Sequence, residues 1–298
     1  RDAMAALAEL CDGSPALQEE ALRGGAVTAL LPYLSPQPGM LESTEGFLMV
    51  VVDCIWRVLL THAPTAEPFI EADGLHPLLD LLSLQLPLLT TPILGALADA
   101  FEIPVGVVRG REWVSPMGGR SLGRVLAALW KMEDDRFGVV YDATGIVLAD
   151  PPEPLIPITD TAAVVSRDLA STLSAKRPFL VKVHDAMPAA MRERLLAQVH
   201  ATDLRFKLYV VLEKVGFVQW KDLLPAEKAR LLVAEKYIAL RDGIMWREIA
   251  SELESEGVRP ISPDIERYNE MVGAAQQVAE SVQAAQTRLL DRVQTTAQ

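Results

Sequence analysis

Apolar positions in the first hundred residues recur at a fixed distance along the chain. Ala26 to Leu34 (AVTALLPYL) aligns with Gly74 to Leu82 (GLHPLLDLL) when the chain is shifted by 48 residues, which places Leu30 on Leu78. Upstream of this match the apolar columns persist, although few residues are identical. Such a pattern is typical of a structural repeat in which only the buried positions are constrained.

Each repeat unit is predicted to contain three helices. In the first unit Ala3 to Leu10 is apolar at helical spacing, a short helix begins near Pro15, and Gly24-Gly25 turns the chain into a third helix. The second unit begins with the apolar segment Val51 to Leu60. This organisation resembles the armadillo repeat, whose period is about 40–47 residues. A generic helical bundle would give the same apolar columns.

The middle of the chain departs from the repeat. A third helix begins at Ile93 to Phe101, and the prolines and glycines from Pro104 to Gly119 predict a loop. The apolar periodicity of Ser121 to Met132 predicts a helix. Val139 to Leu148 (VVYDATGIVL) has two β-prone runs around Asp-Ala-Thr-Gly, which predicts a small β-hairpin. The Pro-rich stretch Asp150 to Pro157 is the best candidate for a linker.

Helical periodicity resumes in the C-terminal half. Asp203 to Val215 is predicted to be a helix that ends at Gly216, and Pro225 to Glu256 a long helix or a pair that breaks at Gly243. The predicted fold class is therefore all-α, with armadillo-like repeats, one hairpin and a terminal long helix. The predicted divisions are 1–108 for the repeats, 109–160 for the loop, helix, hairpin and linker, 161–260 for the helical region, and 261–298 for the tail helix.

The tail has a heptad-like apolar seam. Its e and g positions lack charges, so the apolar stripe is wider than the seam of a two-stranded coiled coil, and a self-dimer would be weak. We expect the helix to lie in a groove formed by a partner protein or by the chain's own Pro225 to Glu256 segment. The predicted partner-binding residues are Ile265, Tyr268, Val272, Ala275, Val278, Val282, Leu289 and Val293.

Composition and net charge disfavour several classes of function for this chain. The chain has 298 residues, 50% of them hydrophobic, and a net charge of -12, which disfavours binding to nucleic acid or to an anionic membrane. The uncharged segment Leu81 to Ala98 contains two prolines and is expected to form buried helices rather than a membrane span. Cys11 and Cys54 each lie in an apolar stretch, which suits core thiols in a reducing, cytoplasmic compartment.

Catalytic and metal-binding patterns are not found in the sequence. The four histidines show no metal-ligand spacing, no nucleophile motif or phosphate loop occurs, and no cofactor is predicted. Glu133, Asp134 and Asp135 are adjacent rather than spaced as in a calcium loop, so we interpret them as a solvated helix end. The sequence therefore favours a non-enzymatic protein that binds others through an extended surface.

Three segments carry a resemblance to a known family. Leu129 to Leu155 (LWKMEDDRFGVVYDATGIVLADPPEPL), Asp203 to Phe217 and Tyr237 to Pro260 resemble the armadillo-repeat cilia- and flagella-associated protein of the axonemal central apparatus. The resemblance implies a scaffold subunit of a central-apparatus projection in motile cilia and flagella. It further implies that neighbouring projection proteins are the partners and that association with microtubules is indirect.

A soluble armadillo adaptor that binds a peptide in its groove is the alternative. Such grooves hold an extended peptide backbone with ladders of asparagine amides. The only asparagine of this chain is Asn269, in the tail, so the predicted repeats lack such a ladder.

The sequence begins at Arg1, inside an apolar-periodic segment. We therefore expect it to be part of a longer protein.

Overall fold

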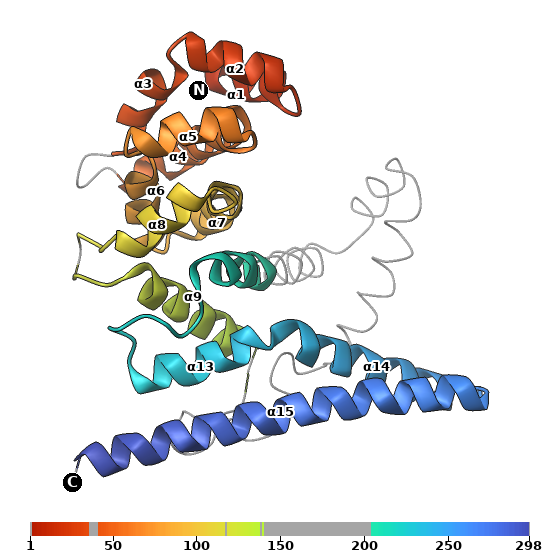
Figure 1. The fold of residues 1–298 in the computed structure, drawn as a ribbon. Helices are drawn as coiled ribbons and strands as arrows, with labels where there is room; N and C mark the ends of the chain where they lie inside the picture. Colours follow the sequence, from red (N-terminus) through yellow and green to blue (C-terminus); the bar gives the residue numbers. More distant parts are fainter. Residues whose placement is uncertain (1, 36–40, 117, 138, 140–203, 298) are drawn as a thin grey trace. The chain divides into compact units, whose positions relative to one another are not determined.

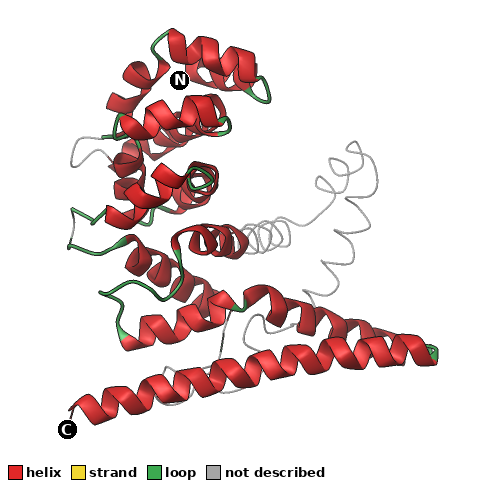
Figure 2. Ribbon diagram, viewed as in Figure 1, coloured by secondary structure: helices red, strands yellow, loops and turns green. Residues whose placement is uncertain are grey.

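The computed structural model describes residues 2–35, 41–116, 118–137, 139 and 204–297. These residues form helices joined by short turns, and they contain no β-strand, only an isolated antiparallel bridge between Val114 and Ser121 (Figure 2). The all-α class is confirmed for this part of the chain. The predicted hairpin is not supported, because all of it except Val139 lies outside the described residues. The predicted linker Asp150 to Pro157 also lies outside them.

The chain divides into two compact units. The first comprises Arg1–Trp130 and Phe206–Glu235, and the second comprises Lys131–Arg205 and Lys236–Gln298. The boundaries predicted after residues 108, 160 and 260 stay predictions.

The first unit is a stack of helical layers (Figure 1). The first layer consists of α1 (Asp2–Cys11), α2 (Pro15–Arg23) and α3 (Ala26–Leu30), and the second of α4 (Leu41–Ile55), α5 (Ala63–Glu71) and α6 (Leu75–Ser83). Short turns, a 3-10 turn at Leu31–Leu34 and a π-helical turn at Trp56–Leu60, extend α3 and α4. Equivalent helices pack on each other, α1 on α4 and α2 on α5. Leu30 and Leu78, aligned by the sequence repeat, are both buried.

The third layer corrects one prediction. It contains α7 (Pro87–Ala100), α8 (Pro104–Glu112) and the start of α9 (Leu122–Phe137). The loop predicted for Pro104 to Gly119 is wrong over its first half, which is α8. Pro104 lies in the first turn, where its missing N–H is tolerated. Gly106 and Gly110 allow close packing, since a Cβ at these positions would lie 2.3 Å from the Ala100 carbonyl oxygen and 2.7 Å from the Phe101 ring.

A fourth layer follows residues 138–203. It consists of a helix at residues 204–215 and α13 (Pro225–Glu235). The Lys214 ammonium contacts the Glu102 carboxylate at the end of α7, 2.8 Å away, and Arg124 of α9 pairs with Glu227 of α13 at 3.2 Å. The helix predicted for Asp203 to Val215 is confirmed over its described residues 204–215, and it ends at Gly216, whose φ of 94° is left-handed.

The second unit contains α14 (Tyr237–Ser255) and α15 (Ser262–Ala297), which pack along each other. The chain breaks between α13 and α14 at Lys236 and not at Gly243, as the sequence had suggested. Gly243 lies inside α14. The terminal long helix predicted from the heptad pattern is confirmed as α15.

Candidate interaction surface on the terminal hairpin

A tight turn joins α14 to α15 and makes them antiparallel. Gly257 has a φ of 68° and closes α14, with its N–H donating to the Glu254 carbonyl, while the Val258 N–H donates to Leu253. This is the hydrogen-bond pattern of a glycine C-cap. The carbonyl of Ile261 then accepts from the first turn of α15. We call α14, this turn and α15 the terminal hairpin.

The two helices approach most closely where small residues meet. A Cβ added to Gly243 would lie only 2.2 Å from the Cβ of Ala275, so this position accepts no side chain without a shift of the helices. Small residues at a helix crossing let the backbones come together. Gly243 is therefore a packing residue. Its role was missed because a glycine in a helical pattern also indicates a break.

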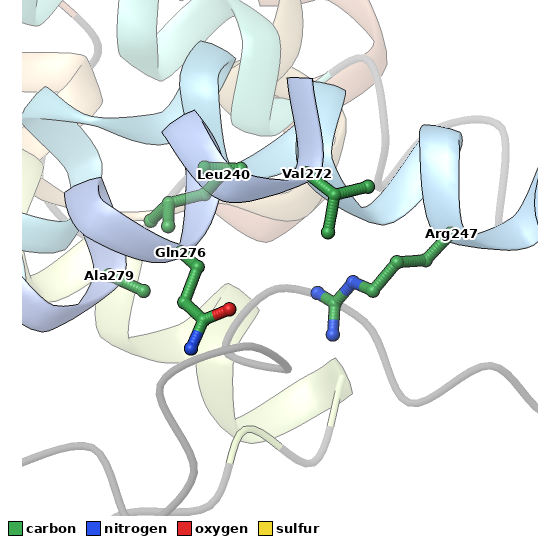
Figure 3. A pocket seen from close by; sticks show the side chains of 6 residues that line it. Leu240, Arg247, Val272, Gln276 and Ala279 are labelled. Carbon is green, nitrogen blue, oxygen red and sulfur yellow. The ribbon is translucent and has the colours of Figure 1, made fainter. Parts of the chain in front are cut away.

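A small hollow of about 120 Å³ lies beside this crossing. Leu240 and Arg247 line it from α14, and Figure 3 shows Arg247 and Gln276 of α15 pointing to the same side of the helix pair. Ligand pockets for drug-sized molecules are usually about 300–1,000 Å³. The hollow is too small for such a ligand, and we interpret it as part of the packing between the helices.

The structure places the predicted partner-binding residues at different depths. Val272 and Ala275 line the hollow and so face α14, together with Ala279. Val282 is buried, whereas Tyr268, Val278 and Leu289 are half-buried and Ile265 is exposed. Val293 lies in α15, but its side chain is outside the described part. Two of the eight predicted residues, Val272 and Ala275, thus face α14, and the assignment of the seam to a partner interface stays a prediction.

Two of the three adjacent carboxylates at the end of α9 are buried, so the predicted solvated helix end is wrong. The Asp134 carboxylate accepts a hydrogen bond from the Arg205 guanidinium at 2.8 Å, and both side chains are almost fully buried. Burial raises the pKa of the Glu133 carboxyl, although Arg136 and Arg205 oppose that shift. Asp135 remains exposed and pairs with Lys131. The sequence shows adjacent acids but not the arginine far along the chain that buries one of them.

The cysteines behave as core residues. Cys11 and Cys54 are buried and free, and burial raises the pKa of the Cys54 thiol to about 11. A thiol with so high a pKa is almost wholly protonated at neutral pH and is a poor nucleophile.

Groups that could bind a metal are not found among the described residues, where no three His, Cys, Asp or Glu side chains gather. His76 Nδ1 lies 2.8 Å from the Asp73 carboxylate, and His62 Nε2 lies 3.3 Å from the Glu19 carboxylate. Within the described ranges no single helix has the length and apolar character of a membrane span. One pair of helices, Gly46–Leu60 and Ala63–Glu71, meets these criteria of length and composition only when taken together, and it is bent by 119° at the break between the two.

Comparison with known proteins gives a consistent result over most of the chain. The sequence model of the family described as "Cilia- and flagella-associated protein 69, ARM repeat" matches residues 1–249. Cilia- and flagella-associated protein 69 of Homo sapiens is 23% identical over 294 residues, which cover 97% of this chain and 29% of that protein. The Mus musculus protein is 23% identical over 301 residues, with the same coverage. The chain thus spans less than a third of the length of these curated relatives.

Proposed function

Because the chain belongs to the armadillo-repeat family of cilia- and flagella-associated protein 69, we propose that it is a structural segment of a protein of cilia and flagella. In this proposal it is a non-enzymatic scaffold in a projection of the axonemal central apparatus, where it binds neighbouring projection proteins. The observation that carries the proposal is the family match over residues 1–249, together with the stacked layers that the described residues of the first unit form.

The layered architecture supports a scaffold role. In such arrays each layer buries its apolar face on its neighbours, which leaves an extended outer surface for protein contacts. The net charge of -12 opposes direct binding to the acidic surface of microtubules. We therefore propose that attachment to microtubules is indirect.

The part of α15 that extends beyond α14 is the proposed contact. With 36 residues, α15 is about 54 Å long, whereas the 19 residues of α14 span about 28 Å. The crossing of Gly243 and Ala275 places the start of α14 near Ser281 in an antiparallel pair. Leu289 and Val293 therefore lie on the part of α15 that extends beyond the start of α14. We propose that a neighbouring protein packs on this part of the predicted seam.

Expression of the full-length protein in a ciliated cell tests the proposal. The parent protein should remain with axonemes after detergent extraction, and cross-linking should join it to other axonemal proteins. The double substitution Leu289→Glu and Val293→Glu should release it, because two charges would be buried in the contact. The matched control places glutamate at the exposed residues Val108 and Val114, and this variant should be retained.

Two results would refute the proposal. Complete extraction of the full-length protein with the soluble fraction would contradict the proposed role as an axonemal scaffold. Retention and unchanged cross-links of the Leu289 and Val293 variant would contradict the assigned contact alone.

A further inference from the structure

One face of α14 is apolar and points away from α15. Gly243 and Leu240 face α15. At 100° per residue, Ile238, Met245 and Ile249 lie on roughly the opposite side of the helix. Their side chains are 41%, 46% and 38% exposed. An apolar row on the side opposite a packed partner helix is the pattern of a helix that packs on two sides.

Further apolar residues widen this row. Trp246 and Leu253 are half-buried, and with Ile249 they have the 3,4 spacing of a helix seam. Val258, 47% exposed, continues the row into the turn. We call these six residues, Ile238, Met245, Trp246, Ile249, Leu253 and Val258, the outer face of α14. Tryptophan in such a row is typical of the residues that dominate binding energy at interfaces.

The charges around the outer face are mainly acidic. Asp242, Glu252 and Glu256 are exposed on this side of the helix, and Arg259 is exposed next to Val258. Arg247 lies on the other side of α14, where it lines the hollow beside α15. A second copy of the chain would bring two acidic rims together, and like charges across an interface oppose association. A basic helix would complement the rim.

We propose that the outer face of α14 binds a basic amphipathic helix of a neighbouring protein. The apolar side of that helix packs on Trp246 and Ile249, and its Lys or Arg side chains pair with the acidic rim. This mode uses anchors at i, i+3 or i+4, and i+7. The surface differs from the proposed contact at Leu289 and Val293, so each can fail without the other.

A peptide titration with the whole chain tests the proposal. The probe is a fluorescein-labelled helix of leucine and lysine, about 18 residues long, with leucine on one side. Its composition control has the same residues with leucine scattered around the helix. The test variant is Met245→Glu with Ile249→Glu, and the matched control is Val108→Glu with Val114→Glu. Circular dichroism verifies that both variants fold.

We expect the amphipathic probe to bind the parent chain and the control variant equally, and the outer-face variant at least about tenfold more weakly. The scattered probe should bind at least about tenfold more weakly to the parent, and raising the salt from about 50 mM to about 500 mM should weaken binding of the amphipathic probe. Equal binding of the two probes, or an unchanged affinity of the outer-face variant, would overturn the proposal. Light scattering that shows a dimer broken by the outer-face substitutions would assign the face to a second copy and would equally overturn it.

Discussion

The buried ion pair between Asp134 and Arg205 predicts a large and asymmetric response to mutation. The Asp134 and Arg205 side chains are 2% and 1% exposed, and the guanidinium nitrogen lies 2.8 Å from the carboxylate oxygen. Asp134 also lies in the last turn of α9, where the helix dipole disfavours a negative charge. The carboxylate is thus stabilised mainly by its hydrogen-bonded partners.

The expected magnitude follows from the balance of charge attraction and desolvation. At an effective dielectric constant of about 20, two unit charges about 4 Å apart attract by about 4 kcal/mol. Desolvation of the two groups costs several kcal/mol per ion, so the pair as a whole contributes little net stability. Removal of one partner leaves the other buried charge without this ion pair, and Asp134→Asn or Arg205→Met should lower the free energy of unfolding by about 3–5 kcal/mol.

Urea denaturation followed by circular dichroism measures this loss. The double variant Asp134→Leu with Arg205→Met should be within about 1 kcal/mol of the parent chain, because it removes both charges together. The matched control is the exposed pair Arg267 and Glu270, whose double substitution by alanine should cost at most about 1 kcal/mol. A loss below about 1 kcal/mol for Asp134→Asn, or a double variant less stable than either single one, would refute the reasoning.

Three further predictions concern the hairpin, a buried acid and microtubules. Gly243→Ala should destabilise the terminal hairpin, because the added Cβ would clash with Ala275. A Cβ at Gly273 meets no atom within 4 Å, so Gly273→Ala should stabilise the hairpin by about 0.5–1 kcal/mol. Thermal melts measure both changes. Glu133→Gln should raise the free energy of unfolding at neutral pH. The pKa of Glu133 is higher in the folded state, so the parent chain loses stability as the pH rises past the unfolded pKa of about 4.3. Urea titrations should therefore show that the gain from the substitution vanishes below about pH 4. The isolated chain should not sediment with bare microtubules at low micromolar concentration, and pelleting at physiological salt would contradict the charge argument.

The repeats could be predicted because burial constrains them directly. Leu30 and Leu78 occupy equivalent buried positions, and this equivalence is visible as an apolar match at a fixed distance. The α8 segment was not predicted, because Gly106 and Gly110 interrupt the apolar period. These two glycines let α8 approach Ala100 and Phe101 closely, and a search for apolar positions cannot detect such a contact.

The candidate site was predictable in part for the same reason. The heptad seam correctly indicated a long helix with an apolar stripe, since periodicity reports which residues share a face. It could not show which surface the stripe contacts. Gly243 has no side chain to give a signal, yet it is where α14 approaches Ala275 of α15 most closely. The outer face of α14 escaped attention because the polar residue Asp242 interrupts it.

The fourth layer shows why a regular repeat search stops early. Ser121 and Asp222 form hydrogen bonds of 2.7 and 3.0 Å although 101 residues separate them, so the contacts of this layer do not follow the 48-residue distance of the first two. A long sequence separation adds little cost to such contacts, because closure entropy grows by only about 0.6 kcal/mol for each doubling of the separation. Burial of Leu208, Val211 and Leu212 on the resumed helix contributes about 1.5–3 kcal/mol per side chain. The gain from a continued stack therefore exceeds the closure cost of so long a sequence separation, and the array can resume wherever an apolar face of suitable shape returns.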